Sequence, residues 1–268
     1  MYIDTHVHLD FKEFDKDRDE VIKRAFSGGV QKIINIGCNL ERSKATVELA
    51  QKYENIFAAV GVHPHDVKKY ESGNMNQELW KLAQNNKVIA IGECGLDYYR
   101  IEDDPSTSLG ASKEIQKEFF KAQIALAQKL NLPLIIHCRD AFQDLLEILH
   151  NTKYILHNTR MGVTHCFSGN RKYAAEFLKL GFLISFTGSI TYTKPDGELL
   201  KVVEEVPIDK MMIETDCPYL APVPHRGERN EPLYVKYVAQ KIAEVKGIKI
   251  REIEKITTEN AIKLFNLK

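Results

Sequence analysis

The sequence of 268 residues predicts a (β/α)8 TIM barrel, which we expect to occupy residues 1–268 as a single domain. Short apolar segments alternate with amphipathic segments along the whole chain, and this alternation is typical of strand–helix units. The apolar segments are almost continuous, which indicates strands buried on both faces of a parallel sheet. Eight such units close most naturally into a barrel, and the chain length suits one barrel.

The expected strands follow one another at intervals that leave room for helices. They lie near residues 2–6, 32–37, 56–61, 88–92, 133–137, 162–165, 182–186 and 211–214. Apolar residues at helical spacing predict helices at 17–26, 43–53, 113–130 and 141–149, and two closing helices at 234–245 and 251–265. A doubly wound open sheet is the alternative. Its GxGxxG fingerprint is missing after the first strand, where a polar His-Val-His stands instead.

The composition bears on partners and location. Lysine plus arginine and aspartate plus glutamate number 37 each, so no basic field over the whole molecule indicates a nucleic-acid partner, and any polyanion must be bound locally. No apolar run reaches the length of a membrane span, and the first residues lack a signal-peptide pattern. The five cysteines are odd in number and lack CxxC spacing, which favours reduced thiols. We therefore expect a cytoplasmic protein with no membrane partner and no obligate protein partner.

Polar residues stand at the ends of the expected strands, where the active sites of TIM barrels lie. His6 and His8 point to the same side of an extended chain, so both can grip one ion. An HxH pair or a lone histidine is often only structural. Here, however, four histidines and two carboxylates would crowd one barrel mouth, and their charges call for a cation. The six predicted metal ligands are His6, His8, Glu93, His137, His165 and Asp216.

The ligand types narrow the choice of metal. Imidazole with carboxylate suits zinc, manganese, cobalt or iron, whereas magnesium prefers oxygen ligands; the identity stays open among these five. Six ligands exceed the needs of one ion, so we expect two divalent metal ions about 3.5 to 4 Å apart, bridged by Glu93, with one ion activating a water. The cysteines that directly follow four of the ligands should turn outward as small buried hydrophobes. They are Cys94, Cys138, Cys166 and Cys217.

Longer motifs around these residues are similar to those of a known family. The sequence resembles the TatD family of metal-dependent deoxyribonucleases, within the wider amidohydrolase-like barrels, over essentially the whole chain. The motifs that carry the resemblance are Asp4-Thr5-His6-Val7-His8-Leu9, Gly61-Val62-His63-Pro64-His65, Ile91-Gly92-Glu93-Cys94-Gly95-Leu96-Asp97-Tyr98-Tyr99, Ile136-His137-Cys138-Arg139-Asp140-Ala141, His165-Cys166-Phe167-Ser168-Gly169, Glu214-Thr215-Asp216-Cys217-Pro218-Tyr219 and Arg226-Gly227 followed by Asn230-Glu231-Pro232.

The resemblance implies an activity and a division of the ligands between two ions. The implied activity is hydrolysis of DNA phosphodiester bonds, often exonucleolytic, so the expected partner is a DNA substrate, as a single strand or a frayed end. Asp216 would orient or deprotonate the attacking water, which makes Asp216 and Glu93 the catalytic carboxylates. The implied ligand sets are His6, His8, Glu93 and Asp216 for one ion, and Glu93, His137 and His165 for the other.

Further polar residues at the same mouth have expected roles beside the metals. We favour His63 and His65 for substrate binding, by phosphate contact or by proton donation to the leaving oxygen. Arg226 is either a phosphate clamp or a brace for the mouth. Asp97 either supports a ligand histidine or caps a loop. The loop after the eighth strand should be fixed by Asn230 and Glu231.

Two other functions stay open. One is a hydrolase of a small phosphoester, lactone or amide, although many such relatives bridge their metals with a modified lysine that strands four and five lack here. The other is a non-catalytic metal-binding barrel, against which Asp216 beside the water position argues. Tyr98 and Tyr99 read as packing residues rather than as base-stacking ones. Segments 101–112 and 151–160 look extended, and we expect 101–112 to be the most mobile.

Overall fold

The computed structural model describes residues 1–99, 112–152 and 161–267, so the expectations for 101–112 and 151–160 fall almost entirely outside the described residues. Eight strands pair in sequence order, each parallel to the next, which confirms the predicted TIM barrel. A further parallel bridge joins Val7 to Cys217 and closes the barrel. The strands are β1 (Tyr2–Val7), β2 (Val30–Ile36), β3 (Ile56–Val60), β4 (Val88–Asp97), β5 (Leu134–Arg139), β6 (Gly162–Thr164), β7 (Leu183–Phe186) and β8 (Met211–Ile213).

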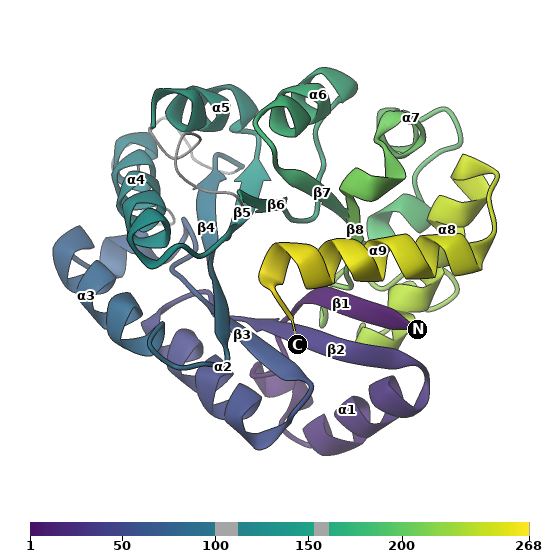
Figure 1. Ribbon diagram of the computed structural model, residues 1–268, viewed down its shortest axis with the longest axis horizontal. Helices are drawn as coiled ribbons and strands as arrows, with labels where there is room; N and C mark the ends of the chain where they lie inside the picture. The colour runs from purple at the N-terminus through teal and green to yellow at the C-terminus, as the bar shows by residue number, and fades with distance from the viewer. Residues whose placement is uncertain (100–111, 153–160, 268) are drawn as a thin grey trace.

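Helices cover the outside of the barrel (Figure 1). Side-chain caps begin some of them: Asn39 accepts the N–H of Arg42 before α2, and Asn170 accepts the N–H of Tyr173 before α6. Their apolar stripes pack on the strands and form the larger core. No helix among the described residues is long and apolar enough to cross a membrane. The helices are α1 (Arg18–Ser27), α2 (Leu40–Lys52), α3 (Ser72–Leu82), α4 (Lys113–Leu130), α5 (Phe142–Asn151), α6 (Arg171–Lys179), α7 (Glu198–Glu205), α8 (Val235–Lys246) and α9 (Ile250–Phe265).

One end of the barrel is closed by α9, which lies across it in Figure 1. Leu264 and Phe265 pack with strand residues such as Ile3 in a second apolar core. On the same helix, the Asn260 amide donates to the carbonyl oxygen of Met211, the first residue of β8, at 2.7 Å. The amino ends of the strands are therefore covered, and the carboxyl ends are left for a functional site.

Two strands run further than the sequence predicts. β4 continues to Asp97 and β5 to Arg139, so Glu93 and His137 lie within strands and not at their ends. Gly95 pairs with His137 in the register of these two strands. Its φ is 143°, and a side chain at this position would overlap the His137 carbonyl oxygen. Glycine therefore allows β4 and β5 to stay paired at close range beyond the predicted ligands.

Candidate metal centre at the barrel mouth

Backbone closure between β1 and the chain after β8 brings the first predicted ligands together. The Asp216 N–H donates to the His6 carbonyl oxygen, and the His8 N–H donates to the Cys217 carbonyl oxygen, both at 2.9 Å. Asp216 Oδ1 then lies 3.7 Å from His6 Nε2 and 3.5 Å from His8 Nε2. The two Nε2 atoms are 3.3 Å apart. These three side chains converge on one point at the mouth.

Glu93 lies between this group and a second pair of histidines. Its Oε1 is 2.8 Å from both His137 Nδ1 and His165 Nε2, and those two nitrogens are 3.1 Å apart. Its Oε2 faces the other way, 3.5 Å from His6 Nε2 and 3.8 Å from His8 Nε2. One carboxylate therefore contacts both groups, which is the position that a bridging ligand occupies.

The orientation of the rings shows that a divalent cation fits these residues. His8 Nδ1 lies 3.0 Å from the Ile36 carbonyl oxygen, which can only accept a hydrogen bond, so Nδ1 carries a proton and Nε2 turns into the site. In the same way His137 Nε2 faces Asp97 Oδ2 at 3.1 Å and leaves Nδ1 for the site. Such partners on the far ring nitrogen are usual for metal-binding histidines. The converging donor atoms are the mixed nitrogen and oxygen set that transition metals prefer.

Burial and the charges of neighbouring groups shift the pKa values at the centre in opposite directions. Burial alone would raise the pKa of Glu93, but the charge of His165 and the hydrogen bonds from His137 and His165 hold it well below its usual range. Burial would lower the pKa of His165, but the charge of Glu93 outweighs it and the pKa lies well above its usual value. Burial dominates at His6 and His63, whose pKa values are lowered. Glu93 is therefore ionised, and His6 and His63 are neutral near pH 7.

The two histidines after β3 lie at the same mouth. His63 Nε2 is 3.7 Å from Glu93 Oε1, and His65 Nε2 is 3.0 Å from Asp97 Oδ2 with half of its side chain exposed. Asp97 is buried and contacts both His65 and His137, and it also accepts the N–H of Tyr99 at 2.9 Å. One carboxylate therefore contacts two histidines and the backbone of the following loop, and its role beside the metals stays a prediction.

The loop after β8 separates the remaining predicted residues from the centre. Asn230 is buried, and its amide donates to the carbonyl oxygens of Thr215 and Tyr219 at 2.8 and 2.6 Å, which ties the loop to Asp216. Glu231 accepts two hydrogen bonds from Arg24 of α1 on the outer side. Arg226 is exposed, and its guanidinium carbon lies 3.8 Å from the ring centre of Tyr192.

Two buried carboxylates beside the centre escaped the sequence interpretation. Glu214 accepts the N–H of Cys166 at 2.6 Å, and the same Oε1 lies 3.3 Å from His165 Nδ1. Asp4 accepts the N–H and hydroxyl of Thr215 at 2.9 and 2.6 Å. The signal was present, because Glu214 precedes Asp216 by two positions and Asp4 precedes His6 by two. That spacing turns side chains to one side of an extended chain.

The four cysteines that follow predicted ligands are not among the described residues whose donor atoms converge on the centre. Cys94, Cys138 and Cys217 are buried free thiols, and burial raises the pKa of each. Cys166 is partly exposed; burial raises its pKa to about 12, and its sulfur lies 3.6 Å from the Thr187 hydroxyl. Thiols with such raised pKa values are poor nucleophiles and poor metal ligands at neutral pH.

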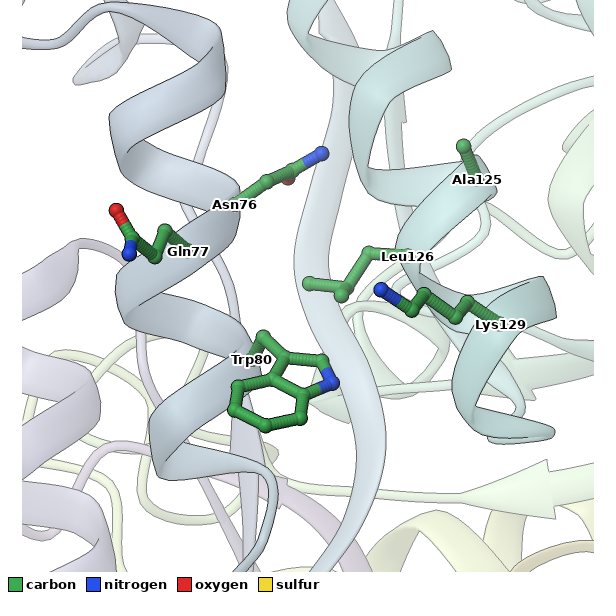
Figure 2. A pocket seen from close by; sticks show the side chains of 6 residues that line it. All are labelled: Asn76, Gln77, Trp80, Ala125, Leu126 and Lys129. Carbon is green, nitrogen blue, oxygen red and sulfur yellow. The ribbon is translucent and has the colours of Figure 1, made fainter.

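A groove of about 440 Å³ lies away from this centre, on the outer wall between α3 and α4 (Figure 2). Trp80 and Lys129 face one another across it, 5.9 Å from the nitrogen to the ring centre. Its lining offers apolar surface and amides but no cluster of imidazole and carboxylate. It is lined by Asn76, Gln77, Trp80, Ala125, Leu126 and Lys129.

A parallel β/α barrel whose carboxyl ends gather histidines and carboxylates around one point defines a metal-dependent hydrolase. The chain belongs to the TatD-related DNase family, whose family model matches residues 3–266. This family assignment agrees with the resemblance of the motifs.

Several known proteins are similar over their whole length. The metal-dependent hydrolase YabD of Bacillus subtilis is 42% identical, with all of both chains covered. The 3'-5' ssDNA/RNA exonuclease TatD of Erwinia tasmaniensis is 36% identical over 98% of this chain and 99% of its own. Among solved structures, the TatD homologue YJJV of Escherichia coli superimposes with a TM-score of 0.88 at 31% identity, covering 100% of this chain and 98% of the other.

Proposed function

We propose that this protein is a metal-dependent exonuclease that hydrolyses DNA phosphodiester bonds at a centre of two divalent cations. The observation that carries the proposal is the position of Glu93, whose two oxygens face two separate groups of histidines. The relatives named as exonucleases support nucleic acid as the substrate, and we propose a single strand or a frayed end. The free thiols support a cytoplasmic location.

Each of the two groups of donor atoms would hold one cation. His6, His8 and Asp216 would hold the first cation, and His137 and His165 would hold the second. Glu93 would contact both cations. When bound, the two cations would supply Lewis acidity, lowering the pKa of a water and stabilising charge on the attacked phosphoryl group. Zinc, manganese, magnesium, cobalt and iron remain the candidates, because cellular supply decides among metals with such ligands.

The protein side chains would orient and receive protons. Burial would raise the pKa of Asp216, but the hydrogen bond from His8 and the charges of His165 and His8 lower it, so its carboxylate is ionised and able to accept a proton from the attacking water. His63 is neutral because burial lowers its pKa, so we assign it a hydrogen bond to a phosphate oxygen and not proton donation. His65 and Arg226 are exposed at the mouth and would bind phosphates further out.

The test is cleavage of end-labelled single-stranded and duplex DNA, with RNA beside them, by metal-stripped protein to which one metal at a time is restored. We expect stepwise shortening that is lost in His137→Ala and Asp216→Ala but kept in His150→Ala and Asp209→Ala, which change exposed residues of the same types. Circular dichroism checks that each variant is folded. If no metal restores cleavage of any strand, the nuclease proposal fails and a small ester or amide becomes the substrate to test.

A further inference from the structure

An exposed aromatic ring stands beside the candidate metal centre. Tyr219 lies in the loop after β8, where its N–H donates to the Asp216 carbonyl oxygen at 3.0 Å, and 51% of the residue is exposed. Its ring meets Phe11 edge to face, with centres 6.3 Å apart and planes at 77°. Phe11 in turn stacks on His8 at 4.7 Å and contacts the guanidinium of Arg42 at 5.1 Å. Phe11 is thus fixed, and Tyr219 offers a supported ring at the entrance.

The opposite wall of the mouth carries an arginine held flat against a tyrosine. Arg139 is the last residue of β5, and its guanidinium carbon lies 3.6 Å from the ring centre of Tyr99. In the strand order of the barrel, β4 and β5 lie across from β8 and β1. Stacking of this kind occupies the face of a guanidinium and leaves its N–H groups free in the plane.

The charge of Arg139 has no carboxylate partner in the part of the chain that the structure describes. Among the described residues, no carboxylate lies within ion-pair distance of Arg139, although the centre next to it is rich in carboxylates. Arginines elsewhere on the surface behave differently: Arg24 pairs with Glu231, and Arg171 pairs with Glu198 and Glu205. An exposed guanidinium that lies over an aromatic ring and pairs with no carboxylate of residues 1–99, 112–152 or 161–267 is suited to a phosphate.

We propose that Tyr219 and Arg139 hold an unpaired strand across the barrel mouth, with a base stacked on the Tyr219 ring and a phosphate of a neighbouring nucleotide on the Arg139 guanidinium. The inference rests on the proposed nuclease function and specifies its substrate. A base inside a duplex is stacked on both faces, so it must leave the duplex before it can stack on Tyr219. Single strands and frayed ends are therefore bound, and an intact duplex is not.

Stacking is tested by the Michaelis constant for a single-stranded oligonucleotide with metal restored. Stacking on an aromatic side chain contributes about 1–3 kcal/mol per base, so Tyr219→Ala should raise KM by roughly tenfold, while Tyr219→Phe keeps it within about threefold. Trp80→Ala is the matched control, because Trp80 is 40% exposed with a lysine near its ring, yet lies outside the mouth (Figure 2).

A modified substrate separates stacking from a merely structural effect. An oligonucleotide series places one abasic nucleotide at each position along the strand in turn. At one position the abasic site should raise the KM of the wild-type protein by the same roughly tenfold factor as Tyr219→Ala does. The abasic site at that position should not raise the KM of Tyr219→Ala any further. Equal additional losses in the variant at every position would overturn the stacking role. For Arg139→Ala, the slope of log KM against log salt should fall by about 0.7, the value for one lost phosphate contact on a single strand. An unchanged slope overturns the phosphate contact.

Failure of the subsite and failure of the proposed function give different results. Bis(p-nitrophenyl) phosphate has a phosphodiester bond but no base and no neighbouring phosphate, so the wild-type protein with metal tests the chemistry alone. If the wild-type protein hydrolyses neither this diester nor DNA, the proposed function is wrong. If it cleaves single strands and Tyr219→Ala has an unchanged KM, only the stacking subsite is wrong.

Discussion

Glu214→Gln is the substitution that most directly tests how the candidate centre is supported. Glu214 is fully buried, and its Oε1 both accepts the Cys166 N–H at 2.6 Å and lies 3.3 Å from His165 Nδ1. Glutamine keeps the shape and one acceptor oxygen but removes the charge. His165 would therefore lose a negative partner on the ring nitrogen that faces away from Glu93, and its other nitrogen would become a weaker metal ligand.

The size of the effect follows from the kind of contact that is lost. Glu214 Oε1 lies within ion-pair distance of His165 Nδ1, but the two atoms are not aligned for a hydrogen bond in the metal-free structure. Contacts with charged groups exceed neutral ones by about 1–1.5 kcal/mol, so loss of the charge predicts up to roughly tenfold weaker metal binding. The charge of Glu214 is also one of the causes that raise the pKa of His165. The variant should hold that proton less tightly, so protons compete less with the metal and the deficit should shrink as the pH falls from 8 to 6.

The measurement is competition for zinc against a chromophoric chelator at both pH values, with hydrolysis rates alongside. Glu205→Gln is the matched control, because Glu205 is exposed and pairs with Arg171 on the surface. Thermal unfolding checks that the variant remains folded. Zinc affinity within twofold of wild type at both pH values, in a folded variant, would show that Glu214 does not support the centre.

Three further predictions use other parts of the molecule. Metal binding to stripped protein should release more protons at pH 6 than at pH 8.5, measured by calorimetry in buffers of different ionisation enthalpy. The reason is the raised pKa of His165. Its proton stabilises the metal-free fold at a pH below the ordinary histidine pKa, and this contribution is lost as the pH rises through the folded-state pKa. Asp17→Asn should lower the free energy of unfolding in urea by about 0.5–1 kcal/mol at pH 7 and by almost nothing at pH 2. The hydrogen bonds from Arg229 lower the pKa of Asp17 from 3.8, so their contribution to stability is lost as the pH falls through the lowered pKa. An equal loss at both pH values would contradict this reasoning. Gly95→Ala should destabilise by about 2–4 kcal/mol, because its Cβ would overlap the His137 carbonyl oxygen at a φ of 143°, and a fall in Tm of less than 2 °C would refute the overlap.

The fold could be predicted because its signal is local. Each strand is a short apolar run and each helix an amphipathic one, so the order of elements and the barrel follow from spacing alone. Strand ends were less predictable. β4 passes Glu93 and continues to Asp97, because the polar side chains there are satisfied by histidines from β5 and the loop after β3. Such partners are distant in sequence, so a single sequence gives no signal for them.

The candidate site could be predicted in part for the same reason. Polar residues at strand ends must meet at one barrel mouth, so the positions of the ligands follow from topology. The edge-to-face contact of Tyr219 with Phe11 joins residues more than 200 positions apart, and only the closed barrel brings them together. Glu214 was different, because its two-residue spacing from Asp216 was visible in the sequence, and the interpretation stopped at the last predicted metal ligand.

The protonation pattern explains how the barrel can fold before any metal arrives. His8, His137 and His165 have raised pKa values, because at these rings the hydrogen bonds and negative charge of the carboxylates outweigh the effect of burial. His6 and His63 also lie near Glu93, but there burial outweighs its charge. In the metal-free protein, protons on these rings neutralise Glu93 and Asp216 where cations would otherwise do so. Two apolar cores of buried side chains hold the barrel together, so we expect folding not to depend on the ion as it does in small zinc domains. Metal binding then becomes an exchange of cations for protons at side chains that the backbone already holds in place.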